Sequence, residues 1–99
     1  MPSDIAYVTL TLSSMKRREA ARLAGALGAV VRAERIRNGL SQEQLAEKAD
    51  VHRNYVSLVE RGLRDPSFSH LAAIAVALGM RPERLVPRAL RSTERAAGR

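Results

Sequence analysis

The side chains able to act as nucleophiles, bases or metal ligands do not assemble into a recognisable catalytic set. Cysteine is absent, so the chain has no thiol nucleophile, thiolate ligand or disulfide. The two histidines, His52 and His70, lie far apart with no third metal ligand nearby. Asp65, Ser69 and His70 do not have the spacing of an acid, a nucleophile and a base, and no glycine-rich loop suits a phosphate. We therefore expect a protein that is not an enzyme and that holds no metal or cofactor.

The charge of the chain points instead to a binding function. There are 17 cations against 10 anions, for a net charge of +7, and all the cations except Lys16 and Lys48 are arginine. Such an excess is typical of proteins that bind polyanions, most often nucleic acid. A general bias of the sequence toward Arg and Ala explains the composition equally well. The three aromatic residues are too few for a surface that stacks single-stranded bases.

The length and hydropathy of the chain bound its architecture. With 99 residues, of which 45% are hydrophobic, the chain supports one modest core. No segment approaches the roughly 20 apolar residues that a membrane-spanning helix needs. The apolar stretch near the start precedes its basic residues, whereas a signal peptide carries them first. We expect a cytoplasmic protein with no membrane contact.

Five helices are predicted, so the fold class is all-α. Ser41 and Gln44 have the spacing of a capping box, and Ser67 or Ser69 suits the start of a later helix. Gly25 and Gly28 are expected to break the first helical stretch into two pieces. The predicted helices cover about residues 14–37, 41–49, 53–61, 67–78 and 82–90.

The two ends of the chain are expected to lie outside this bundle. Residues 5–12 are rich in β-branched side chains and are predicted to be extended, either as a strand that pairs with another chain or as a loose arm. The domain division that follows is an N-terminal arm or strand over residues 1–14, a DNA-binding domain over residues 15–90, and a flexible basic tail over residues 91–99.

The spacing of the second and third helices is that of a helix-turn-helix, with the motif at about residues 41–62. In this arrangement the first helix lies across the DNA backbone, and the second presents its outer face to the major groove. Ala46 is small enough to let the two helices approach closely. Asp50 lies at the turn, where a left-handed backbone is needed; Asp tolerates that conformation better than most residues.

The motif resembles the Cro/C1-type (XRE family) helix-turn-helix regulators. The similarity covers about residues 27–87 and includes Leu-Ser-Gln-Glu-Gln-Leu-Ala at residues 40–46. His-Arg-Asn-Tyr-Val-Ser at residues 52–57, followed by Glu-Arg-Gly at residues 60–62, is most similar to the controller proteins of restriction–modification systems. The sequence departs from the family pattern at Asp50, where Gly is usual, at Arg81, where a capping Ser or Asp is commoner, and in its longer N-terminus.

The resemblance implies a five-helix bundle of the phage-repressor type that binds a partly palindromic operator as a homodimer. By position, the residues implied to contact bases are Arg53, Asn54, Ser57 and Leu58. Those implied to contact DNA phosphates are Gln42, Tyr55, Arg61 and Arg64. Arg35 and Glu60 match an ion pair between the first helix and the recognition helix. The residues left for the dimer interface are Leu85, Val86, Ala89 and Leu90.

Plainer roles stay open for several of these positions. Arg53 could be a solvated surface cation, Leu58 could be a packing residue, and Leu85 and Val86 could belong to the core. Two functions also remain. The favoured one is an autoregulatory transcription regulator, as a restriction–modification controller or a phage-type repressor. The alternative is an antitoxin that binds a toxin through its termini, residues 1–14 and 88–99, and represses its own operon.

Overall fold

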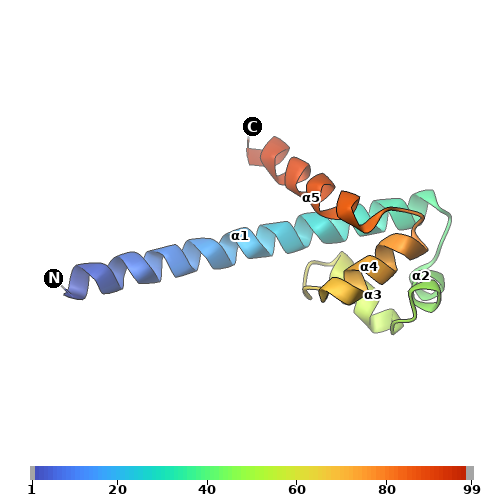
Figure 1. The fold of residues 1–99 in the computed structure, drawn as a ribbon, viewed down its shortest axis with the longest axis horizontal. Helices are drawn as coiled ribbons and strands as arrows, with labels where there is room; N and C mark the ends of the chain where they lie inside the picture. The colour runs from blue at the N-terminus through green and yellow to red at the C-terminus, as the bar shows by residue number, and fades with distance from the viewer. Residues whose placement is uncertain (1, 98–99) are drawn as a thin grey trace.

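The computed structural model describes the backbone of residues 2–97 and the side chains of residues 16–93. It contains the five predicted helices and no strand over that range. The helices are α1 (Pro2–Arg37), α2 (Gln42–Ala49), α3 (Arg53–Glu60), α4 (Phe68–Ala77) and α5 (Pro82–Ala97). The all-α expectation is confirmed. Helix α1 lies between α5 on one side and α2, α3 and α4 on the other, and its N-terminal half projects beyond the packed helices (Figure 1).

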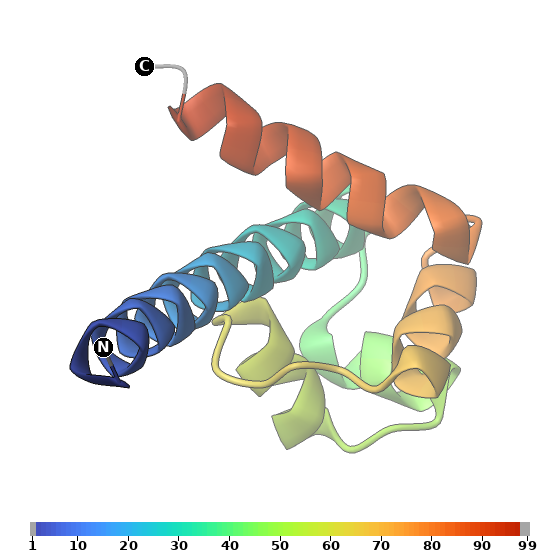
Figure 2. The same cartoon turned by 60° about the vertical axis from the view of Figure 1, so that its left-hand side comes forward.

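The core is formed where the other four helices meet the C-terminal half of α1. The largest fully buried side chains are Leu45, Ile74, Leu85, Val31, Val56 and Val59. Each helix therefore contributes at least one, and the two short helices of the motif are anchored by theirs. Figure 2 shows α3 and α4 on one side of α1, with α5 crossing α1 near its C-terminal end. Burial of these apolar side chains, rather than intrinsic propensity, stabilises helices as short as α2 and α3.

The prediction that residues 5–12 are extended is wrong. Residues 5–12 are helical, and α1 begins at Pro2 with no break at the expected boundary of residues 14 and 15. Proline is well suited to the first turn of a helix because its missing N–H has no intrahelical partner there. A formed helix extends by one hydrogen bond for each residue added, and the propensity cost of a β-branched residue is below about 0.7 kcal/mol. A helix anchored in the core can therefore continue through this segment.

The two glycines of α1 do not break the helix as predicted; they bring it close to its neighbours. A Cβ added at Gly28 would lie 2.2 Å from the carbonyl oxygen of Val59 and 2.7 Å from that of Glu60. Gly62, with φ of +70°, lies against Gly25 in the same way, since a Cβ there would be 2.8 Å from the Gly25 Cα. The absence of side chains at these positions sets the distance between α1 and the end of α3.

Helix α5 is longer than predicted at its C-terminal end. It runs to Ala97, so residues 91–97 are helical where the sequence suggests an irregular tail. A partly buried ion pair, which no local pattern in the sequence indicates, joins α5 to α1. Glu34, 4% exposed, accepts a hydrogen bond from Arg88 and also lies 3.6 Å from Arg37. This contact fixes the N-terminal half of α5 against α1.

Candidate nucleic-acid interface

The capping box and the tight turn that predict the helix-turn-helix are both present in the structure. The Ser41 hydroxyl accepts from the backbone N–H of Gln44 at 3.0 Å, and the Gln44 side-chain oxygen accepts from the Ser41 backbone N–H at 2.8 Å. The predicted capping box is confirmed. Asp50 closes α2 in the left-handed conformation, with φ of 56°. Its backbone N–H and that of Val51 donate to the last carbonyls of α2, which gives the tight turn into α3.

Helix α3 has a capping residue that the sequence analysis missed. His52 precedes the helix, and its Nδ1 accepts a hydrogen bond from the backbone N–H of Asn54 at 3.1 Å. The other histidine, His70, lies beside Tyr55, with Nδ1 3.1 Å from the tyrosine hydroxyl and ring centres 4.8 Å apart. Both histidines thus have structural partners.

The four residues proposed for base contacts share the outer face of α3. Arg53 and Asn54 are exposed, and Ser57 and Leu58 are partly exposed. The opposite face carries the buried Val56 and Val59. Helical geometry accounts for this division, because positions separated by four residues lie on the same side of a helix. The structure therefore brings these four side chains together on the solvent-facing side of α3.

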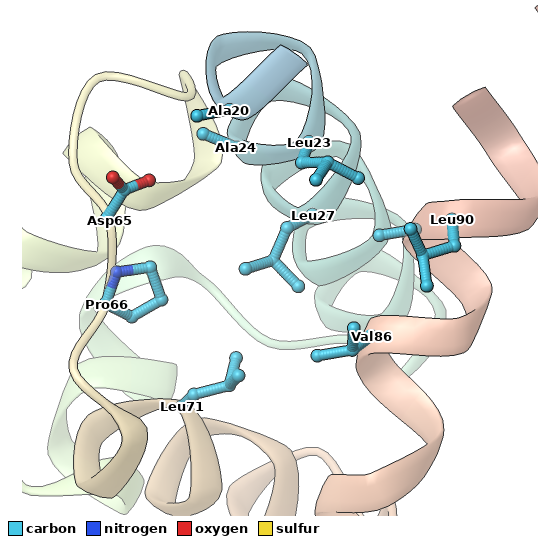
Figure 3. A pocket seen from close by; sticks show the side chains of 10 residues that line it. Ala20, Leu23, Ala24, Leu27, Asp65, Pro66, Leu71, Val86 and Leu90 are labelled. Atoms are coloured by element: carbon cyan, nitrogen blue, oxygen red, sulfur yellow. The ribbon is translucent and has the colours of Figure 1, made fainter. Parts of the chain in front are cut away.

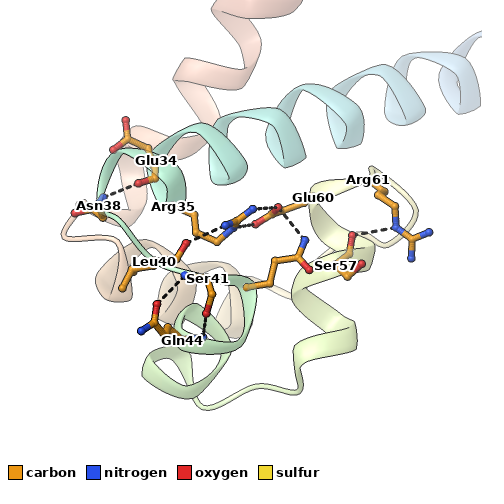
Figure 4. A network of polar contacts seen from close by, with 10 residues as sticks. Glu34, Arg35, Asn38, Leu40, Ser41, Gln44, Ser57, Glu60 and Arg61 are labelled. Atoms are coloured by element: carbon orange, nitrogen blue, oxygen red, sulfur yellow. Dashed lines mark hydrogen bonds and ion pairs between the residues drawn. The ribbon is translucent and has the colours of Figure 1, made fainter.

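The predicted partners Arg35 and Glu60 form a buried, two-pronged ion pair. Arg35 Nε lies 2.6 Å from one carboxylate oxygen of Glu60, and Nη2 lies 3.0 Å from the other (Figure 4). The guanidinium also donates to the carbonyl of Leu40 at 2.9 Å. The hydrogen bond to Glu60 raises the pKa of Arg35 above its already high ordinary value; burial opposes this rise, and charge attraction adds to it. The pair joins α1 to the end of α3.

The residues proposed for phosphate contacts lie around the outer face of α3, and most of them also have partners within the chain. The side-chain amide of Gln42, at the start of α2, donates to Glu60 at 3.2 Å. The Arg64 guanidinium lies 5.4 Å from the centre of the Tyr55 ring. Arg61 is exposed, and its Nε donates to the Ser57 carbonyl at 3.4 Å. The side chains are thus held near the motif, and the Tyr55 side chain also packs against the core.

The residues proposed for a dimer interface divide into two pairs. Leu85 is fully buried and Ala89 is 3% exposed, so both belong to the core of the single chain and are not available to a partner. Val86 and Leu90 are 45% and 41% exposed. They lie over an apolar hollow between α1, α4 and α5 (Figure 3), whose lining also includes Leu23, Leu27 and Leu71.

Within the described part of the chain, no helix is long and apolar enough to cross a bilayer. The geometry above is that of a helix-turn-helix domain, and comparison with protein families agrees. The chain belongs to the helix-turn-helix family, whose model matches residues 31–85. It is an XRE-type domain, and it belongs to a family of DNA-binding transcriptional regulators rather than of enzymes.

Several relatives give this assignment more detail. The chain is 42% identical over 50 residues to the control protein C.BamHI of Bacillus amyloliquefaciens, a match that covers 50% of this chain and 62% of that protein. The gene regulator ClgR of Corynebacterium glutamicum has a similar structure, with a TM-score of 0.72 and 34% identity over 77% of this chain and 81% of ClgR. The restriction–modification controller C.Esp1396I, solved as a tetramer with its natural 35-base-pair operator, gives a TM-score of 0.60 and 29% identity over 69% of this chain and 95% of that one.

Proposed function

We propose that this protein is a sequence-specific regulator that binds a partly palindromic operator in double-stranded DNA as a homodimer and controls its own transcription. The observation that carries the proposal is the outer face of α3, where Arg53, Asn54, Ser57 and Leu58 lie together at the end of a capped and rigidly held motif. Membership of the helix-turn-helix family and the similarity to control proteins support it.

The side-chain chemistry of this face suits the edges of base pairs. The guanidinium of Arg53 can donate two hydrogen bonds to guanine, and the amide of Asn54 can pair with adenine, each contributing about 1–3 kcal/mol of discrimination. Leu58 can contact a thymine methyl group. Gln42, Tyr55, Arg61 and Arg64 are proposed to bind phosphates, which position the protein without reading sequence. For Gln42, binding a phosphate would add to the hydrogen bond that it makes to Glu60 or replace it.

The dimer is proposed to form through the apolar hollow beside α5. Val86 and Leu90 are exposed there, and the ring of Phe68, 85% exposed, lies at the start of α4 next to a second small hollow that also includes Val86. Adjacent exposed apolar side chains of this kind are typical of surfaces that another protein covers. A two-fold related copy would bury them and would place two α3 helices on one side of the DNA.

The first experiment is selection of bound duplexes from a random pool near physiological salt. We expect enrichment of inverted half-sites spaced about one helical turn apart. The selected site is then titrated with the wild type, with Arg53→Ala and with Arg84→Ala, which removes an exposed arginine from α5 on the far side of α1. Arg53→Ala should lose preference at one base pair, whereas Arg84→Ala should keep it. Unchanged preference in Arg53→Ala would reject its role in reading bases.

The same titration separates the two kinds of contact. Gln42→Ala or Arg61→Ala should weaken binding to all sequences alike and reduce the dependence on salt, because phosphate contacts are independent of sequence. A loss confined to one base position would contradict the assignment.

Val86→Asp should convert the dimer into a monomer in analytical ultracentrifugation, while Arg84→Ala serves again as the control. Persistence of the dimer in Val86→Asp would move the interface elsewhere.

A further inference from the structure

A second basic surface lies outside the helix-turn-helix, where α1 passes the segment that follows α3. A groove runs between them, and its two walls carry Arg17 from α1 and Arg64 from the segment. Its floor is formed by small side chains of α1, including Ala21 and Ala24. Asp65 also lines the groove, so the lining carries two positive charges and one negative charge and is basic overall.

The orientation of Arg17 follows from helical geometry. Gly28 marks the face of α1 that contacts the end of α3, since a Cβ there would lie 2.2 Å from the Val59 carbonyl oxygen. Arg17 lies eleven residues earlier, which is close to three complete turns at 3.6 residues per turn, so it lies on the same face. At 1.5 Å per residue it is about 16 Å further along the axis. Arg17 therefore carries basic charge along the α3 side of α1, past the end of the motif.

The other wall of the groove is held in place. The Arg64 guanidinium lies 5.4 Å from the centre of the Tyr55 ring, and the Tyr55 hydroxyl is hydrogen-bonded to His70. Gly62 lies so close to Gly25 that any side chain at Gly62 would have to move α1 away. The two arginines thus line one groove from two different elements, with small side chains of α1 between them.

We propose that this groove binds the sugar–phosphate backbone of DNA: Arg64, proposed above as a phosphate contact, holds the backbone on one wall, and Arg17 neutralises a further phosphate from the other wall. The proposal rests on the proposed DNA-binding function and extends it to a second site. The exposed Arg61 links the two surfaces along the chain, because it caps the end of α3 and directly precedes the groove residues 62–65. The alanines on the α1 side of the groove are small and allow a backbone to approach closely, while the exposed Leu63 lines the opposite side.

The test is the salt dependence of binding to one long duplex that contains the selected operator. Each phosphate neutralised adds about 0.9 to the slope of log affinity against log salt. Arg17→Ala should therefore reduce the slope by about 0.9, so that between 50 and 200 mM salt it loses three- to fourfold less affinity than the wild type. Arg17→Lys should keep the slope, because a lysine can neutralise the same phosphate.

Arg22→Ala is the matched control. Arg22 is exposed on the same helix, and it makes a surface ion pair of 3.8 Å with Glu19. Five residues separate it from Arg17, which turns it about 140° around the axis, away from the groove. Arg22→Ala removes the same charge as Arg17→Ala, and the slope of log affinity against log salt for this variant should stay near that of the wild type.

The outcomes distinguish the two proposals. Equal slopes for Arg17→Ala and Arg22→Ala, with specific binding by the wild type, would overturn the groove site and leave the proposed function standing. Failure of the wild type to select any sequence would instead overturn the proposed function. Phosphate ethylation on the same duplex gives a second measurement: Arg17→Ala should remove interference at phosphates that Gln42→Ala leaves affected. Loss of the same phosphates in both variants would also refute the separate site.

Discussion

Replacing Glu60 by alanine should strongly destabilise the protein. The Glu60 side chain is 2% exposed, and its carboxylate accepts from Arg35 at 2.6 and 3.0 Å and from Gln42 at 3.2 Å. Removing it leaves the guanidinium of Arg35, 12% exposed, without its counter-charge. Breaking a buried ion pair by deleting one partner typically costs about 3–5 kcal/mol. A domain of this length has about 5–15 kcal/mol of stability in total, so the loss is a large fraction of it.

Thermal unfolding followed by far-UV circular dichroism measures this cost. For a domain of this size we expect the melting temperature to fall by at least about 12 °C, at about 4–8 °C for each kcal/mol. Glu43→Ala is the control, because Glu43 is an exposed acid on α2 and its loss should change stability by less than about 0.5 kcal/mol. The double variant Arg35→Leu with Glu60→Leu should recover part of the loss, since a well-packed apolar pair can replace a buried ion pair at little cost.

Two results would refute this reasoning. One is a Glu60→Ala protein within about 1 kcal/mol of the wild type, which would mean that Arg35 finds water when its partner is removed. The other is a double variant that loses the sum of both single changes, which would mean that the two side chains do not interact.

Three further predictions follow from the same structure. Gly28→Ala should destabilise by about 1–3 kcal/mol in urea unfolding, since its Cβ would lie 2.2 Å from a backbone oxygen; Ala33→Gly, at an exposed site of the same helix, should cost only about 1 kcal/mol. Asp50→Ala should destabilise by about 1 kcal/mol, whereas Asp50→Gly should not, because φ is 56°; equal melting temperatures for the two would contradict this. The pKa of Arg35 is higher in the folded state than in the unfolded state. The stabilisation that Arg35 contributes is therefore fully present below the pKa of the unfolded state and is lost only as the pH rises through the pKa of the folded state. Arg35→Leu should show the same loss of stability at about pH 6 and pH 9.

The central part of the fold was predictable because its determinants are local. The capping box at Ser41, the turn at Asp50 and the stop at Gly62 each act over a few residues, and the predicted helices at 41–49 and 53–61 match α2 and α3 to within one residue. The choice between Ser67 and Ser69 needed the structure, which shows that Ser67 caps α4 by accepting from the backbone N–H of His70.

The remaining features depend on contacts that local patterns do not contain. Glu34 and Arg88 are 54 residues apart, so no spacing rule pairs them. The difference between Leu85 and Val86, adjacent in sequence, is a rotation of about 100° around α5 that carries one into the core and leaves the other exposed. The same limit applies to Gly28: a glycine in a helix suggests a break, and only the neighbouring carbonyls of α3 show that it is a packing contact.

The position of Glu60 suggests why a costly buried charge is present at the motif. Its carboxylate is bound by Arg35 from α1 and by Gln42 from α2, while Glu60 itself ends α3, so a single side chain joins three helices. An apolar contact would hold these helices together without fixing their rotation, whereas three directional hydrogen bonds also fix their angles. A recognition helix that reads bases needs that fixed angle, because a shift of α3 relative to the start of α2 would move its outer face out of register with the phosphates that Gln42 is proposed to contact. On this argument the ion pair contributes to orientation as much as to stability, and an apolar pair at residues 35 and 60 should preserve folding while weakening discrimination between operator sequences.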